Sequence, residues 1–191
     1  MKKIIEGDVV LDILYLKELV DISDVEVKGY FNCQNNNLTN LVGSPHTVGR
    51  GFYCDNNNLT SLEGGPQTVW GDFHCDTNYL TSLKGAPHTV GEYFMCFHNH
   101  LTSLEGAPQI IGGLNHHGSL FYCQNNNLTS LVGAPQIVGG DFDCRENPIT
   151  SLEGIPKTIN NHFIIDKSLK DRFPEEYIRS LSKIEGKVLY K

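Results

Sequence analysis

Apolar residues recur along this chain at fixed positions of a 21-residue unit. One copy, residues 70–90, reads WGDFHCDTNYLTSLKGAPHTV, and its positions are numbered here from 1 at Trp70 to 21 at Val90. Phe occupies position 4 and Cys occupies position 6, while positions 3, 5 and 7 vary between copies. This alternation is the period of a short, half-buried strand. The unit therefore predicts one strand around positions 4–6.

The other apolar positions lie in a segment that is rich in turn residues. Leu or Ile stands at position 11, Leu at position 14, and Val or Ile at position 21, with Gly at 16 and Pro at 18. No helical run is long enough to form between these residues. The cysteines at 33, 54, 75, 96, 123 and 144 mark the copies, with spacings of 21, 21, 21, 27 and 21 residues. A fixed period of this length is typical of a solenoid.

Position 9 is Asn in every copy: Asn36, Asn57, Asn78, Asn99, Asn126 and Asn147. An inward amide at a tight turn can bond the backbone groups that the turn leaves unpaired. We therefore expect a ladder of buried amides between stacked units. The alternative is a ligand site lined by these asparagines.

The pattern F-x-C-x-x-N-x-L-x-x-L resembles the signature of leucine-rich repeat proteins over roughly residues 8–166. The resemblance implies a parallel sheet of about eight short strands on a concave face, an irregular convex side, and protein binding by the concave face. The form LTSLEGAPxxVGGxFxC is similar to repeats in uncharacterised proteins of tailed bacteriophages and some bacteria. One departure is that the Val or Ile lies one place before the usual leading Leu.

The repeat divides the chain into a solenoid with a cap at each end. Residues 1–27 are predicted to form an N-terminal cap coil, with Val9, Leu11, Leu14 and Leu16 at positions 4, 6, 9 and 11. The solenoid covers 28–166, in units 28–48, 49–69, 70–90, 91–111, 112–138 and 139–159 and a last strand at 160–166. Residues 167–191 are predicted to be a C-terminal helical cap. Its helix would begin at Pro174 and end at Gly186, with an apolar stripe of Phe173, Tyr177, Ile178, Leu181 and Ile184. A partner-binding helix is the alternative.

The fifth unit carries six extra residues, 112–117, just before its strand. Such an insertion should loop out at one edge of the stack. It is either a functional loop bearing Asn115, His116 and His117 or a tolerated surface insertion.

Composition narrows the partner class. The formal net charge of −7 disfavours nonspecific binding to nucleic acid or to anionic membranes. The start, MKKIIEGDVVLDILYL, has no long apolar run, so neither a signal peptide nor a membrane span is expected. A cytoplasmic protein is predicted, which would be the host cytoplasm for a phage-encoded chain.

The cysteines and histidines favour neither disulfides nor a metal site. Equivalent Cβ atoms of stacked parallel strands run parallel at about 4.8 Å, whereas a disulfide needs roughly 3.5–4.5 Å. Buried free thiols are therefore predicted, and no cysteine pair has zinc-binding spacing. His98 and His100 follow a strand while His116 and His117 precede one, which places them at opposite ends of the sheet. No metal, no cofactor and no enzymatic activity are predicted, since HExxH, GxSxG and Walker A motifs do not occur.

Positions 3, 5 and 7 should point outward from the concave sheet and form its binding surface. The residues predicted there to contact a partner are Tyr30, Tyr53, Asp55, Asp72, His74, Asp76, Tyr93, Met95, Phe97, Tyr122, Asp141 and Asp143. Aromatic residues surrounded by acids are typical anchors of protein interfaces. The sequence thus predicts a non-enzymatic protein-binding solenoid whose partner has a basic rim. Its resemblance to phage repeats implies an inhibitor of a host protein, for example one of a defence system. The alternatives are a sponge for a small molecule such as a signal nucleotide, an acidic nucleic-acid mimic, or an inert surface.

Overall fold

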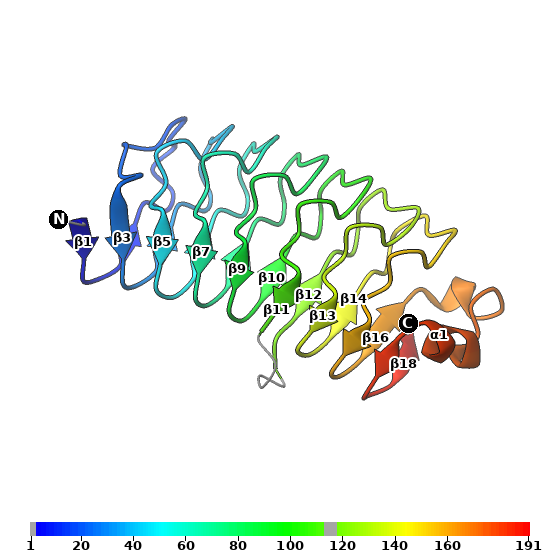
Figure 1. The fold of residues 1–191 in the computed structure, drawn as a ribbon. Coiled ribbons are helices and arrows are strands. Elements are labelled where there is room, and N and C mark those ends of the chain that lie inside the picture. Colours follow the sequence, from blue (N-terminus) through cyan, green and yellow to red (C-terminus); the bar gives the residue numbers. More distant parts are fainter. Residues whose placement is uncertain (1–2, 113–117) are drawn as a thin grey trace.

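The chain forms a parallel β-solenoid of about nine turns (Figure 1). A computed structural model describes residues 3–112 and 118–191. Successive turns stack along one axis, from the N-terminal strands at one end to helix α1 at the other. Within the described ranges, no helix is both long and apolar enough to cross a membrane.

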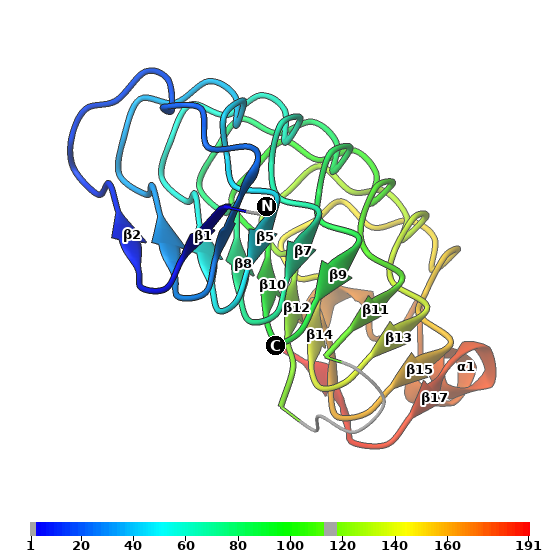
Figure 2. The ribbon, with the colours of Figure 1, turned by 60° about the vertical axis from the view of Figure 1, so that its left-hand side comes forward.

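Each turn gives one strand to each of two nine-stranded parallel sheets, seen as two rows in Figure 2. Sheet A contains β1 (Lys3–Ile5), β3 (Val25–Val27), β5 (Thr47–Val48), β7 (Thr68–Val69), β9 (Thr89–Val90), β11 (Ile110–Ile111), β13 (Ile137–Val138), β15 (Thr158–Ile159) and β17 (Lys183–Ile184). Sheet B contains β2 (Val9–Val10), β4 (Phe31–Asn32), β6 (Phe52–Tyr53), β8 (Phe73–His74), β10 (Phe94–Met95), β12 (Phe121–Tyr122), β14 (Phe142–Asp143), β16 (Phe163–Ile165) and β18 (Val188–Tyr190).

Sheet A corrects the prediction of a single sheet of about eight strands with an irregular far side. Sheet B is the predicted sheet at positions 4–6, whereas sheet A arises from positions 20 and 21. These strands are mostly two residues long, which is too short for alternation to reveal them in the sequence. Thr and Val at these positions are β-branched and repeat in register, as in the pairs Thr47–Thr68 and Val48–Val69. Among the described residues, the rest of each repeated unit contains no helix, as expected.

The core is a column of stacked side chains that runs along the axis. Phe at position 4 is at most 1 % exposed in all seven turns that carry it, and neighbouring rings lie 5.2–5.9 Å apart between centroids. Positions 6, 11, 14 and 21 are likewise buried, which confirms the predicted core. Each fully buried side chain of this size contributes about 1.5–3 kcal/mol. A single turn cannot offset its own ordering entropy, so the turns depend on one another.

The asparagine ladder is confirmed. The Asn57 amide donates to the carbonyl of Cys33 in the preceding turn at 2.9 Å and to those of Cys54 and Asp55 in its own turn. Its Oδ1 accepts the N–H of Leu38 at 3.0 Å. The same pattern repeats at Asn78, Asn99, Asn126 and Asn147. Each amide thus donates to and accepts from the backbone and so joins two turns.

Glycine at position 16 is required by both conformation and space. Gly85 has a φ of +88°, and a Cβ there would lie 2.6 Å from backbone atoms of Leu62 and Glu63 in the preceding turn. Only glycine allows the turns to approach so closely in this conformation.

The N-terminal residues form a degenerate first turn, with β1 in sheet A and β2 in sheet B. Val9 pairs with Phe31, the position 4 residue of the next turn, as the repeat alignment predicts. Leu14 stands where other turns have Asn, and it is 55 % exposed. The N–H of Leu14 donates to Oδ1 of Asn36 in the second turn.

The C-terminal tail forms a further turn rather than a helix alone. A 3-10 helix (Lys167–Leu169) and α1 (Glu175–Leu181) precede β17 and β18. The predicted helix ends five residues before Gly186, because Ile184 pairs with Ile159 in sheet A. Phe173, Ile178 and Ile184 are buried, but Tyr177 and Leu181 are 46 % and 42 % exposed, so the predicted stripe only partly packs.

Candidate functional site: the outer face of sheet B

Positions 3, 5 and 7 of the turns form one outward surface on sheet B, called the sheet B face below. Register pairs place the position 5 residues side by side, in the order Asn32, Tyr53, His74, Met95, Tyr122 and Asp143. The predicted residues are thereby brought into three adjacent rows. Most of them are half-buried.

Aromatic rings make contact along the N-terminal half of this face. Tyr30 stacks on Tyr53 with centroids 5.7 Å apart, and Tyr53 meets the His74 ring edge-on at 4.9 Å. The Arg50 guanidinium lies over Tyr30, 5.4 Å from its centroid. These contacts restrict the rotation of the rings. Binding through them would therefore cost less side-chain entropy.

The acids at position 3 act as caps between turns as well as surface charges. Asp72 Oδ1 accepts the N–H of Tyr93 at 3.2 Å, and Asp141 Oδ1 accepts that of His162 at 3.0 Å. Burial and the neighbouring Asp72 raise the pKa of Tyr53 to about 12. Burial, followed by Asp141 and Asp143, also raises the pKa of Tyr122. Both phenols therefore remain neutral hydrogen-bond donors in ordinary conditions.

Asp143 is not the free rim charge that the sequence predicts. It is 3 % exposed, and its carboxylate pairs with Arg145 two residues further on, with an Oδ2–Nη2 distance of 2.7 Å. Residues two apart in a strand point to the same side, so the long Arg145 side chain folds back over Asp143. This pair removes one negative charge from the predicted rim.

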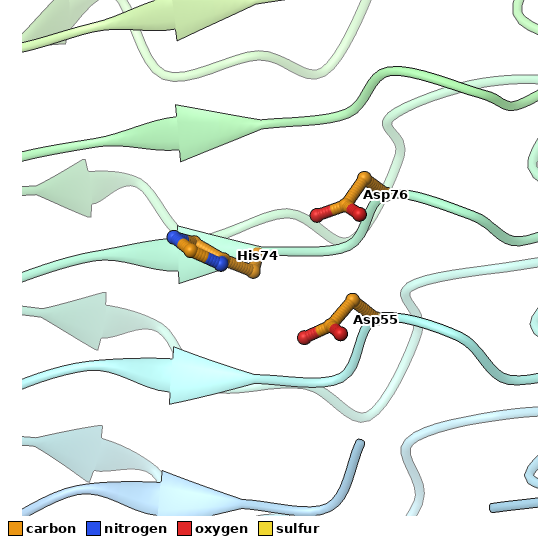
Figure 3. Close-up of side chains that lie close together, drawn as sticks. All are labelled: Asp55, His74 and Asp76. Atoms are coloured by element: carbon orange, nitrogen blue, oxygen red, sulfur yellow. The ribbon is translucent and has the colours of Figure 1, made fainter. Parts of the chain in front are cut away.

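Asp55, His74 and Asp76 form a compact cluster on neighbouring turns (Figure 3). One donor atom from each lies within 4.8 Å of those of the other two. Asp76 is 9 % exposed, so it too is buried rather than part of an open rim. The cluster arises because Asp55 and Asp76 both occupy position 7 of stacked turns, while His74 is at position 5, on the same side of its strand as Asp76.

Burial and like charge disfavour the ionised forms of both carboxyl groups in this cluster. Burial and then the nearby Asp55 charge raise the pKa of Asp76 to about 7. Burial and then Asp12 raise the pKa of Asp55, and burial lowers the pKa of His74. Among the described residues, no Lys or Arg forms a salt bridge with either carboxylate. The sequence predicts all three residues on one face. It predicts them as separate contacts for a partner, however, and not as one cluster.

A groove on the sheet A side was not predicted from the sequence. Its volume is about 990 Å³, and its apolar lining comes from Trp70, Ala86, Pro87, Ala107, Pro108 and Ile110. Trp70 is 60 % exposed and Ile110 is 43 % exposed. A sequence signal exists, since Trp70 stands at position 1, where Gly49, Gly91 and Gly139 stand in other copies. The exposed position of Trp70 can be interpreted only once sheet A is known, and the repeat pattern does not predict sheet A.

The insertion residues Asn115, His116 and His117 lie outside the described residues, so their role stays a prediction. The six cysteines are free and buried, as expected.

No protein-family model matches the chain, and neither the curated proteins nor the solved structures contain a significant match. The leucine-rich repeat assignment and the phage resemblance remain predictions.

Proposed function

We propose that this protein is a non-enzymatic binding protein that grips a protein partner with the sheet B face. The observation that carries the proposal is the ordered position 5 row of Tyr53, His74, Met95 and Tyr122, flanked by Tyr30, Tyr93 and Phe97. A half-buried aromatic row on an outward sheet surface provides large, rigid contact area of the kind found at interface hot spots.

The negative charge of the chain favours one kind of partner surface. The chain has a net charge of −7, and Asp55, Asp72 and Asp141 flank the aromatic row without a salt bridge among the described residues. Such a surface favours a partner whose own patch is apolar at its centre and basic at its edge. The resemblance of the repeats to phage proteins adds the finer proposal that the chain is phage-encoded and inhibits a host protein, for example one of a defence system.

The test is capture from a bacterial lysate followed by measurement of affinity for the recovered protein. Tyr93→Ala combined with Phe97→Ala should weaken binding at least about 30-fold, since truncating a central aromatic commonly costs about 2 kcal/mol or more. The melting temperature should change little, because both side chains lie outside the core. The matched control is Trp70→Ala with Ile110→Ala, which removes apolar surface from the groove on sheet A. Loss of binding in the control but not in the sheet B variant would show that the wrong face has been assigned.

A second candidate function follows from the groove. About 990 Å³ is within the size of small-molecule sites, and an exposed indole can stack on a planar ring. A signal-nucleotide sponge would use this groove. Trp70 is the only tryptophan of the chain, so its fluorescence reports on the groove alone. A saturable change on titration with nucleotides that is absent with Trp70→Phe would support this function, whereas an unchanged signal would exclude stacking on Trp70.

A further inference from the structure

We infer that Asp55, His74 and Asp76 form a binding site for a divalent transition-metal ion, of which Zn²⁺ is the representative. The inference does not depend on the proposed protein partner. It concerns three side chains whose donor atoms already face one another on the sheet B face (Figure 3).

The parallel register sets the geometry. Tyr53 pairs with His74, and the N–H of Asn56 donates to the carbonyl of Asp76 at 3.1 Å. The two position 7 carboxylates are therefore held side by side on adjacent turns, and the imidazole lies next to them. Their donor atoms are within 4.8 Å of one another. Ligands at about 2.0–2.2 Å from a common zinc ion lie roughly 3–4 Å apart, so small side-chain rotations suffice.

The imidazole is held in place by its neighbours. His74 offers one ring nitrogen to the two carboxylates, and its Nε2, the nitrogen farther from them in Figure 3, is buried with no hydrogen-bond partner in the part of the chain that the structure describes. The ring also contacts Tyr53, which limits its freedom to turn away.

The residues around the cluster favour a bound metal cation. Two carboxyl groups share the site with an imidazole, and a bound cation would offset the repulsion between the carboxylates. The Gln34 amide, oriented to donate, reaches Asp55 Oδ2 at 3.2 Å while accepting from Asn32. Thr77 Oγ1 donates to Asp76 Oδ2 at 3.3 Å. These neighbours orient the carboxylates in the way that outer residues orient metal ligands.

The donor set selects the class of ion. Imidazole favours zinc and other first-row transition metals, whereas Mg²⁺ and Ca²⁺ favour sites made of oxygen alone. Three protein donors leave a coordination position open, and Asp55 and His74 are half-buried, so the site faces solvent. The open position can hold water or a side chain from another molecule.

The experiment is calorimetric titration of untagged, chelator-stripped protein with Zn²⁺. Wild-type protein should bind one Zn²⁺ tightly, and Asp76→Asn and His74→Gln should each reduce the affinity of that site at least about tenfold. Matched controls are Asp141→Asn, an acid of the same face, and His100→Gln, an exposed histidine, and both should bind as wild type does. Millimolar Mg²⁺ should not displace the zinc.

Folding and binding are separated by a second readout. Saturating Zn²⁺ should raise the melting temperature of wild type and of both controls but not that of Asp76→Asn, whose own melt shows that it is folded. Equal Zn²⁺ affinity in wild type and the two cluster variants would overturn the inference, as would the lack of a tight site in wild type. Displacement by Mg²⁺ would overturn the choice of metal class.

Discussion

At the scale of single residues, the stack is specified by side chains that bond to the backbone of the next turn. Asn at position 9 is the main example, because its amide serves two turns at once. The preceding position has a positive φ, which is 51° at Asn56 and 53° at Thr77. Asn tolerates this conformation better than most residues, and a β-branched residue such as Thr tolerates it poorly. Position 8 is Asn at residues 35, 56 and 125, whereas residues 77, 98 and 146 adopt the same conformation with Thr, His and Glu.

Asp76 predicts a pH dependence of stability in metal-free protein. Its pKa in the folded state is about 7, against an ordinary value of 3.8. A carboxyl with a raised folded-state pKa destabilises the fold as pH rises from about 4 to about 7, because the unfolded chain loses its proton first. A fully enclosed group with this shift would cost about 4 kcal/mol, and partial solvent access reduces the expected cost to roughly 1–2 kcal/mol.

Asp76→Asn should therefore stabilise the chelator-treated protein by roughly 1–2 kcal/mol at pH 8 and hardly at all at pH 4. Urea unfolding at the two pH values measures the difference. Asp141→Asn controls for the loss of one negative charge from the same face. An equal effect of Asp76→Asn at both pH values would contradict the assignment.

At the scale of elements, the C-terminal strands protect the end of both sheets. β18 pairs with β16 along Phe163, Ile164 and Ile165, while β17 pairs with β15. The Ser182 hydroxyl adds a bond of 2.6 Å to the carbonyl of Pro156. Without these strands, the apolar edge of β16 would be open to pairing with other chains.

Deletion of residues 167–191 should lower the melting temperature by roughly 10 °C or more and cause self-association, because several buried side chains and both edge strands are lost. Thermal melts and light scattering behind size-exclusion chromatography measure both effects. Leu181→Gln, at an exposed position of α1, is the control for a change in the tail that leaves the strands in place. A truncated protein that stays monomeric with an unchanged melt would show that the tail is not a cap.

The elements differ in how far the sequence predicts them. Phe31 and Cys33 repeat every 21 residues with a strand period between them, so sheet B and its core were predictable. Thr47–Val48 is too short for a period, so sheet A was not. The row of the candidate site followed from the same alternation, but the Asp143–Arg145 pair and the Asp55–His74–Asp76 cluster depend on side-chain directions and on distances between turns. Repeat spacing alone fixes neither.

At the scale of the whole molecule, the strand pairs of the described residues join neighbouring turns, so the ends should open before the middle. Each of the six buried cysteines reports on its own turn. Burial raises the pKa of every one of these thiols, and Cys54 and Cys75 also donate to carbonyls of the next turn.

Native protein without reductant should therefore react slowly with a thiol reagent, and all six cysteines should react after denaturation. In intermediate denaturant, mass spectrometry should find Cys33 and Cys144 labelled before Cys75 and Cys96. Fewer than six reactive thiols after unfolding would reveal a disulfide or a bound metal. Labelling that begins at Cys75 would contradict opening from the ends.

The asparagine ladder also requires successive turns to keep one register. Each Asn is matched to a carbonyl and an N–H of the preceding turn, and those groups recur at the same place in every repeated turn. Loss or duplication of one whole 21-residue unit would bring together two turns that already fit. Another unit length is compatible with the stack only where it leaves these bonds in place, as in the 27-residue fifth unit, whose Asn126 still bonds to Cys96 and Leu101. Such a chain can lengthen or shorten its sheet B face by one row at a time, through genetic events that keep the period.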